Sequence, residues 1–275
     1  MSGVLYVVAT PIGNLDDITR RGISVLTSVQ MIAAEDTRRT QVLLAEIGSR
    51  QAELVPLHAH NEQAASRRII AALKRGVEVA LVSDAGTPLL CDPGFDLVRQ
   101  CWQESVPVVP IPGSSSVLAA LSVCPLPTAR FYFEGFLPAR IGPRRARLRE
   151  LLRFPSAVVF FEAPHRVEAC LADLEVMQPA RRIMVGREMT KRHETYYFDT
   201  AGAVARLLKD TSQLRGEFVL VMEGSDAIGL DIDAMRAMDI LSSELPPAQA
   251  ARIGAQLLDV DKSELYDLVI KQRKP

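Results

Sequence analysis

LVSDAGTPLLCDPG, residues 81–94, is an apolar run that breaks into a turn rich in glycine, proline and aspartate before a segment with a helical pattern. PIPGSSS, residues 110–116, repeats this arrangement. In an open α/β sheet, ligands bind at the carboxyl ends of the strands, where such turns expose backbone N–H and C=O groups. Two turns of this kind in succession predict one small-molecule pocket whose walls consist mainly of backbone.

Apolar runs rich in β-branched residues alternate with amphipathic stretches through the first half of the chain. Within residues 62–75, for example, Ala65, Ile69 and Leu73 recur at helical spacing. Such alternation predicts a parallel sheet that is covered by helices on both faces. The expected strands are Val4–Ala9, Met31–Ala34, Glu53–Leu57, Val77–Val82 and Val106–Ile111.

The prolines at positions 125 and 127 interrupt this pattern and mark a domain boundary. We therefore predict an N-terminal parallel-sheet domain at residues 1–124, a mixed α+β domain at 125–226, and a small helical C-terminal module at 231–275. In the second domain we expect strands at Arg130–Phe136, Ala157–Phe161, Ile183–Arg187, Glu194–Phe198 and Glu217–Met222, and helices at Pro143–Leu152 and Arg166–Met177. The module consists of three short helices, with Pro246-Pro247 opening the second and the capping pattern Asp261-x-x-Glu264 opening the third.

The composition excludes several classes of protein. A net charge of −1 gives no overall attraction to nucleic acid, so we expect no DNA partner, and an RNA partner would need a local patch. The four cysteines lack C-x-x-C spacing, which argues against a zinc site or a disulfide scaffold and favours a cytoplasmic location without a metal. No apolar run is long enough to span a membrane. The fingerprints G-x-G-x-x-G, G-x-x-x-x-G-K-[ST], H-E-x-x-H and G-x-S-x-G are absent.

Eight motifs in a fixed order resemble the tetrapyrrole-methylase family of S-adenosylmethionine-dependent methyltransferases, in particular the branch that methylates ribose 2′-hydroxyls of 16S ribosomal RNA. The resemblance runs from about Val4 to Gly224. The motifs are ATPIGNLDDIT, AAEDTRRT, SDAGTPLLCDPG, PIPGSSS, FEGFLP, FFEAPHR, GREMTKRHE and GEFVLVMEG. Porphyrin and corrin methylases typically carry a G-D-P-type turn where this chain has SDAGTP, as the ribosomal RNA branch does.

The resemblance implies two α/β domains with S-adenosyl-L-methionine bound in the cleft between them, and a homodimer. It implies 2′-O-methylation of a cytidine in the decoding centre of the 30S subunit. The family holds the cofactor mainly through backbone groups, in agreement with the pocket inferred above. Carried onto this chain, the cofactor-binding residues would be Pro11, Asp84, Gly86, Thr87, Ser114, Ser115, Gly135, Phe136, Phe161, Glu162 and Glu217.

Methyl transfer from a sulfonium is an in-line displacement, so alignment in a dry cleft supplies much of the catalysis. A ribose hydroxyl is a poor nucleophile at neutral pH and benefits from a general base or nearby cations. Glu35 and Asp36, at the end of the second strand, are the candidate bases, and Lys191 is a weaker candidate from the second domain. The alternative for Glu35 and Asp36 is a helix cap with a salt bridge to Arg38 or Arg39.

Five arginines lie within residues 140–149 of this otherwise neutral chain, and no acid appears before Glu150. Such a density of one charge is what phosphate contacts require, whereas the solvated face of a helix usually carries mixed charge. Two arginine pairs, Arg20-Arg21 and Arg38-Arg39, follow the loops after the first and second expected strands and could extend the basic path toward the active site. The predicted RNA-binding residues are Arg20, Arg38, Arg140, Arg144, Arg145, Arg147 and Arg149.

Two other functions remain open at this point. One is C-methylation of a corrin or porphyrin on the same fold, and the other is a non-catalytic RNA-binding assembly protein. The arginine density and the helical tail count against a tetrapyrrole substrate, which needs neither. The tail, with helix-turn-helix proportions at Ala248–Leu258 and Ser263–Lys271, could dock RNA or support a dimer.

Overall fold

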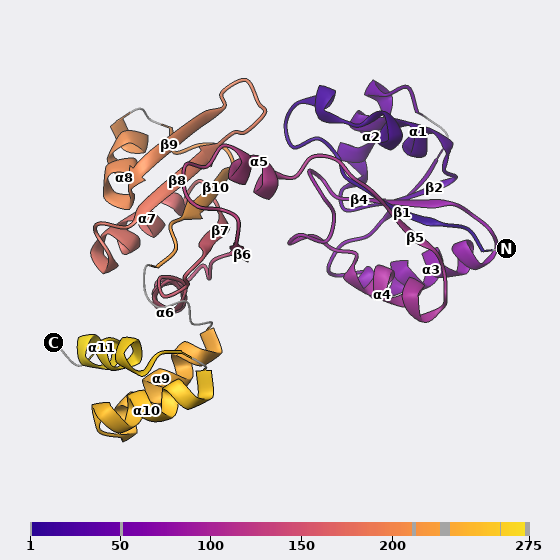
Figure 1. The fold of residues 1–275 in the computed structure, drawn as a ribbon. Coiled ribbons are helices and arrows are strands. Elements are labelled where there is room, and N and C mark those ends of the chain that lie inside the picture. Colours follow the sequence, from indigo (N-terminus) through magenta and orange to yellow (C-terminus); the bar gives the residue numbers. More distant parts are fainter. Residues whose placement is uncertain (1, 50–51, 211–212, 226–231, 259, 273–275) are drawn as a thin grey trace. The chain divides into compact units, whose positions relative to one another are not determined.

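A computed structural model describes residues 2–49, 52–210, 213–225, 232–258 and 260–272 of the chain (Figure 1). It divides into two compact units, residues 1–122 with 188–195, and residues 123–187 with 196–275. The first break falls within two residues of the predicted boundary. Segment 188–195 differs from the prediction, because it joins two strands of the second sheet in sequence and yet belongs to the first unit.

The first unit contains a five-stranded sheet in the order β3-β2-β4-β1-β5. Its strands are β1 (Leu5–Val8), β2 (Met31–Ala34), β3 (Glu53–Pro56), β4 (Val79–Val82) and β5 (Val108–Ile111). All four neighbouring pairs are parallel, as predicted. The carboxyl ends of all five strands therefore meet at one edge of the sheet.

Helices cover both faces of this sheet because alternate side chains of the strands point to opposite faces. Leu5, Ala33 and Leu81 pack under α3 and α4, while Val8 and Ile32 pack under α1 and α2. Figure 1 shows the two helix pairs on opposite faces. The helices are α1 (Arg20–Ser28), α2 (Thr37–Glu46), α3 (Glu62–Lys74) and α4 (Phe95–Gln103), followed by the short α5 (Ser116–Ser122).

The second unit contains a mixed sheet in the order β6-β7-β10-β8-β9. β6 and β7 are parallel, and β10 runs antiparallel to both β7 and β8. The strands are β6 (Phe131–Phe136), β7 (Ala157–Glu162), β8 (Arg182–Arg187), β9 (Thr195–Thr200) and β10 (Phe218–Met222). Each lies within two residues of the strand that its apolar run predicts.

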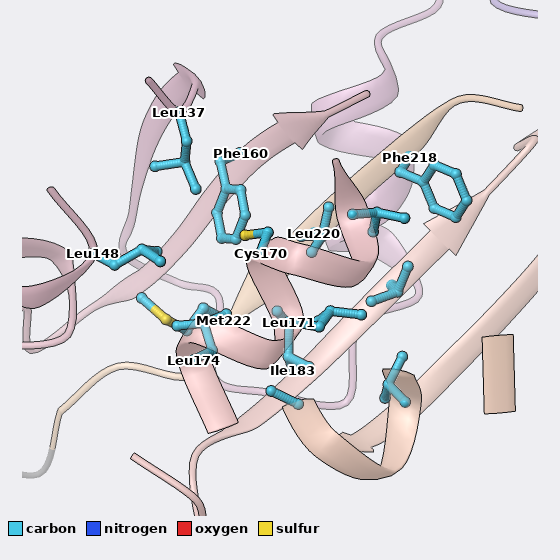
Figure 2. Packing of buried hydrophobic residues seen from close by; sticks show 14 of the residues in the cluster. Leu137, Leu148, Phe160, Cys170, Leu171, Leu174, Ile183, Phe218, Leu220 and Met222 are labelled. Carbon is cyan, nitrogen blue, oxygen red and sulfur yellow. The ribbon is translucent and has the colours of Figure 1, made fainter. Parts of the chain in front are cut away.

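One face of the second sheet packs against α6 (Ile141–Leu151), α7 (Val167–Met177) and α8 (Ala201–Asp210). Phe160 and Leu220 from the sheet and Leu171 and Leu174 from α7 are at most 1% exposed. Figure 2 shows these side chains in one cluster, with Cys170 beside the ring of Phe160. The predicted helix Pro143–Leu152 begins two residues after the first residue of α6, and the predicted helix Arg166–Met177 begins one residue before α7.

The C-terminal module consists of α9 (Ile232–Glu244), α10 (Pro247–Leu258) and α11 (Lys262–Gln272). Pro247 opens α10, where its missing N–H costs no helical hydrogen bond. Asp261 accepts a hydrogen bond from the Ser263 amide (2.7 Å), in agreement with the predicted cap. Met238, Ala250 and Leu265 form a core of their own within the module.

Within the described ranges, no helix is both long and apolar enough to cross a bilayer. The same residues contain no cluster of three or more His, Cys, Asp or Glu side chains that could hold a metal ion. The four cysteines are not paired in disulfides.

Candidate functional site

Four loops meet at the edge of the first sheet where its strands end, and together they form what we call the carboxyl edge. They are residues 9–14 after β1, residues 35–36 after β2, residues 83–94 after β4 and residues 112–115 after β5. Because β2, β4, β1 and β5 are consecutive neighbours in the sheet, these loops are also neighbours in space.

Hydrogen bonds fasten the loops of the carboxyl edge to one another. Thr10 and Gly86 exchange backbone bonds of 2.9 and 3.0 Å. The Thr87 hydroxyl donates to the Ser114 carbonyl (3.0 Å), and the Ser114 hydroxyl donates to the carbonyl of Asp17 (3.2 Å). The predicted residues Pro11, Gly86, Thr87 and Ser114 are therefore brought together in one unit.

Asp84 connects the second and third loops. Its Oδ1 accepts a hydrogen bond from the Asp36 amide (3.0 Å), and its Oδ2 lies 3.3 Å from Nη1 of Arg39. The Asp84 amide lies 3.5 Å from Oε2 of Glu35. Residues that the sequence analysis assigned separately to cofactor binding and catalysis thus share one cluster.

Asp36 also has the helix-capping role that the sequence analysis left open. Its Oδ1 accepts a hydrogen bond from the Arg38 amide (2.8 Å) at the start of α2. The accompanying arginine contact differs from the expectation, because Arg39 pairs with Asp84 and not with Asp36. Ser115 is also a helix cap, since its hydroxyl accepts from the Leu118 amide (3.4 Å) in α5.

Burial and like charge raise the pKa values of two carboxyl groups at the carboxyl edge. Burial, and then the charge of Asp84, raises the pKa of Glu35. Burial, and then the charge of Glu35, raises the pKa of Asp92 to about 6, although a hydrogen bond with Ser83 opposes the rise. Sequence reasoning missed Asp92 as a site residue. The available signal was its position in a proline-flanked turn within an unusually long loop.

The loop that carries Asp92 is held in a strained conformation. Leu89 and Cys91 have φ values of 76° and 70°, in the left-handed region that non-glycine residues rarely adopt. At its far end, Oε1 of Glu62 accepts hydrogen bonds from the amides of Gly94 and Asp96 (2.9 Å each). This anchor on α3 keeps the strained loop in place.

Lys191 lies in segment 188–195, which packs on the first loop. Its ammonium lies 2.9 Å from Oε1 of Glu188, and its side chain crowds the place that a Cβ atom on Gly13 would occupy. The predicted catalytic candidates Glu35, Asp36 and Lys191 therefore all belong to the first unit.

In the second unit, aromatic rings gather at the carboxyl ends of β6 and β7. Phe136 is 54% exposed, and its ring centroid lies 5.4 Å from that of Phe161. Gly135 has a φ of 76° at an irregularity in the β6–β7 register. Glu217 is exposed just before β10. This exposed aromatic surface suits stacking against a planar ring.

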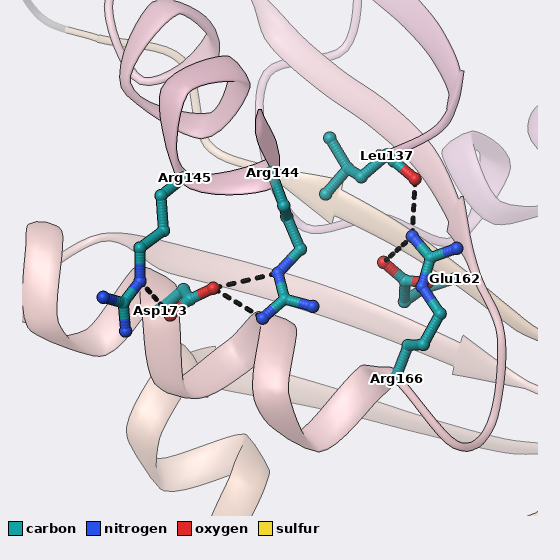
Figure 3. A network of polar contacts seen from close by, with 6 residues as sticks. All are labelled: Leu137, Arg144, Arg145, Glu162, Arg166 and Asp173. Carbon is teal, nitrogen blue, oxygen red and sulfur yellow. Dashed lines mark hydrogen bonds and ion pairs between the residues drawn. The ribbon is translucent and has the colours of Figure 1, made fainter. Parts of the chain in front are cut away.

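The side chain of Glu162, a predicted cofactor-binding residue, has a structural role. Its side chain is completely buried, Nε of Arg166 lies 2.8 Å from its Oε1, and the Ala163 amide donates to the same oxygen (3.0 Å). Arg166 also donates to the carbonyl of Leu137 (Figure 3). The network ties the end of β7 to the chain that follows β6, so any contact of Glu162 with the cofactor would be made by its backbone.

The arginine cluster of α6 requires a larger correction. Arg144 is only 5% exposed and donates through Nε and Nη2 to one oxygen of Asp173 (2.9 and 2.7 Å), while Arg145 donates to the other oxygen (2.7 Å; Figure 3). Arg144 therefore fastens α6 to α7 and is not available for phosphate contacts. The prediction for Arg144 failed because its acidic partner, Asp173, lies on another helix, 29 residues later in the sequence.

Arg147 is also engaged within the second unit. It donates to both carboxylate oxygens of Glu134 on β6 (2.7 and 2.6 Å) and to Glu150 (2.7 Å). Arg140 and Arg149 at the two ends of α6 are exposed, as are Arg20 and Arg38 in the first unit. The predicted RNA-binding set is thereby reduced to these four arginines and the partly engaged Arg145.

Residues 4–205 match the family described as Tetrapyrrole (Corrin/Porphyrin) Methylases, and residues 229–273 match the RsmI C-terminal HTH domain. This chain belongs to the tetrapyrrole-methylase family. The C-terminal match identifies the helical module of this tetrapyrrole methylase as a helix-turn-helix domain.

Curated relatives of this tetrapyrrole methylase match it over almost its whole length. Proteins from Neisseria meningitidis serogroup A and Escherichia coli O157:H7 are 45% and 43% identical over 98% of this chain and 94% and 96% of their own. One from Xylella fastidiosa is 45% identical over 96% of this chain and 98% of its own. All three are named ribosomal RNA small subunit methyltransferase I.

Solved structures share the fold at low sequence identity. A uroporphyrin-III C-methyltransferase from Thermus thermophilus, complexed with S-adenosyl homocysteine, has a TM-score of 0.57 at 17% identity and covers 80% of this chain and 97% of its own. A cobalt precorrin-4 methyltransferase has a TM-score of 0.59 at 16% identity, with coverages of 80% and 94%. The predicted two-sheet tetrapyrrole-methylase fold is confirmed.

Replacing Asp173 with alanine should destabilise the second unit by about 3–5 kcal/mol, because the buried guanidinium of Arg144 loses its partner. Replacing Arg145, whose side chain is 45% exposed, should cost at most about 1 kcal/mol. Urea unfolding of both variants measures the difference. An equal, small loss in both would show that the Arg144–Asp173 pair is not the structural contact described here.

Replacing Asp92 with asparagine should stabilise the chain at pH 7.5 more than at pH 4.5. Because folding raises the pKa of Asp92 from 3.8 to about 6, its contribution to stability is complete below pH 3.8 and is lost as the pH rises through about 6. Asparagine does not ionise, so its side chain keeps this contribution to stability as the pH rises. Thermal unfolding across this pH range tests the prediction, with the exposed Asp16→Asn as control. A gain that does not vary with pH would contradict it.

Proposed function

We propose that this chain transfers a methyl group from S-adenosylmethionine to the 2′-hydroxyl of a cytidine in the decoding centre of 16S ribosomal RNA. The observation that carries the proposal is the near-complete match to proteins named ribosomal RNA small subunit methyltransferase I, which extends through the helix-turn-helix module. Only RNA-directed relatives among those described above share that full length. We place this reaction in the cytoplasm and retain the expected homodimer as part of the proposal.

The carboxyl edge suits the methyl donor in charge. When bound, S-adenosylmethionine supplies an electrophilic methyl group on a cationic sulfonium, beside a cationic ammonium. Glu35, Asp84 and Asp92 supply carboxylates in a partly buried loop cluster, where their attraction for cations is stronger than in water. Gly86 and Gly113 allow the loops of the carboxyl edge to pack closely, because a Cβ atom on Gly86 would lie 3.2 Å from the Ile12 side chain and one on Gly113 would lie 3.0 Å from the Ala9 side chain.

We assign the residues of this edge separate roles in the reaction. Asp84 holds the second and third loops together and accepts a hydrogen bond from Asp36, which caps α2 and thereby positions Glu35. Glu35 is the proposed proton acceptor for the ribose hydroxyl, since its raised pKa makes it a stronger base than an ordinary carboxylate. Lys191 would stabilise the developing alkoxide. Gly135, Phe136, Phe161 and Glu217 of the second unit remain proposed donor contacts.

The proposed reaction is tested by supplying labelled S-adenosylmethionine with 30S subunits, naked 16S RNA and a uroporphyrinogen in parallel. The labelled methyl group should be found on the ribosomal RNA. One phosphodiester bond of that RNA should then resist alkaline hydrolysis, because a methylated 2′-oxygen cannot attack the adjacent phosphate. The Asp84→Ala variant should transfer at least about tenfold less label. Label on the uroporphyrinogen or on a nucleobase would contradict the proposed acceptor.

Replacing both Arg20 and Arg38 with alanine should weaken RNA binding and make it less dependent on salt. Each lost phosphate contact lowers the slope of log K against log[salt] by about 0.7–0.9. Arg75→Ala is the matched control, since this exposed arginine follows α3 close to the start of β4, at the opposite edge of the sheet. Filter binding at several salt concentrations would contradict the assignment if the double variant and the control had the same slope.

A further inference from the structure

Residues 188–191 make close contacts with the first loop of the carboxyl edge. The Asn14 amide donates a hydrogen bond to Oγ1 of Thr190 (3.1 Å). A Cβ atom on Gly13 would lie 2.9 Å from Oγ1 of Thr190 and 3.0 Å from the carbonyl oxygen of Met189. Only glycine allows the loop to approach this segment so closely.

The backbone of this segment is strained at two positions. Glu188 and Thr190 have φ values of 51° and 63°. A β-branched residue in this region is unusual, and such strain persists only where the surroundings hold it. Glycine would adopt the conformation more readily, but it has no hydroxyl to accept the Asn14 hydrogen bond. The side chain therefore explains why threonine is suited to this position.

The segment is also held by its own contacts. The Lys191 amide donates to the Glu188 carbonyl (3.0 Å), and the Lys191 ammonium pairs with the Glu188 carboxylate (2.9 Å). Met189 is 6% exposed. Thr190 is therefore presented to the first loop from a well-defined turn.

We propose that Thr190 is a positioning residue for methyl-donor binding. The reciprocal bonds between Thr10 and Gly86 fix one end of the first loop, and the Thr190 hydroxyl fixes the other end at Asn14. Residues 11–13 lie between these two fixed points. Their backbone is thereby held in one conformation for the donor. The inference rests on the proposed function, because it assumes that this loop binds S-adenosylmethionine.

The test compares Thr190→Val, which keeps the shape of the side chain without its hydroxyl, with Thr190→Ser, which keeps the hydroxyl. Calorimetric titration with S-adenosylhomocysteine should give a Kd about 3–10-fold higher for the valine variant, as expected for one lost hydrogen bond. The serine variant should bind within about twofold of the wild-type chain. Thr195→Val, which removes a hydroxyl from the same segment, is the control and should also bind normally.

Kinetics separate positioning from a general loss of structure. In the valine variant KM for S-adenosylmethionine should rise while kcat at saturating donor stays unchanged, and the thermal midpoint should fall only slightly, as expected for one lost hydrogen bond. Equal affinity of the valine variant and the wild-type chain would overturn the proposal, as would a serine variant as weak as the valine variant. A wild-type chain that binds S-adenosylhomocysteine but does not methylate RNA would refute the proposed acceptor alone. A wild-type chain that does not bind it would refute both.

Discussion

The carboxylate of Asp84 is the contact on which the arrangement of the carboxyl edge depends. β2 and β4 are parallel neighbours, so their following loops must lie side by side, but nothing in the sheet itself fixes the distance between those loops. Asp84 does so by accepting the Asp36 amide and pairing with Arg39. The same arrangement brings the carboxylates of Glu35 and Asp92 near it, and their raised pKa values show that the cluster costs folding free energy at neutral pH. A cluster of this kind suits a site that binds a cation.

Much of the fold could be predicted from the sequence because its strands are short apolar runs between turns. Buried parallel strands have no polar face, so the run itself marks the strand, and the glycine- and proline-rich turns mark its carboxyl end. The loops of the carboxyl edge could be predicted for the same reason. Asp92 could not be singled out, because its significance depends on burial beside Glu35. Segment 188–195 follows β8 in the chain, and it is its contacts with the first loop, at Gly13 and Asn14, that place it with the first unit.

The arginines of α6 show why charge density in a sequence is a weak guide to a binding surface. Helix α6 itself has one acidic residue for its four arginines, but Glu134 on β6 and Asp173 on α7 supply carboxylates from other elements. Arg144 and Arg147 consequently fasten the helix to the second sheet and its covering helix. Arginine suits this role because its planar group makes several directed hydrogen bonds at once. An RNA surface must therefore be sought among the arginines that the fold leaves exposed, at the ends of α6 and beside the carboxyl edge.

Backbone strain is concentrated beside the proposed site. Among the described residues, the non-glycine residues with positive φ are Leu89, Cys91, Ser105, Glu188 and Thr190. All but Ser105 lie in the third loop or in the segment that packs on the first loop.

Each strained conformation costs about 1–3 kcal/mol, so contacts elsewhere must hold it. Glu62 anchors the third loop, and the Thr190–Asn14 contact joins the other segment to the first loop. In-line methyl transfer requires donor and acceptor atoms to be aligned closely, and loops fixed in this way lose little further entropy when the donor binds. The strain is thus a cost in stability that is consistent with a preorganised binding site.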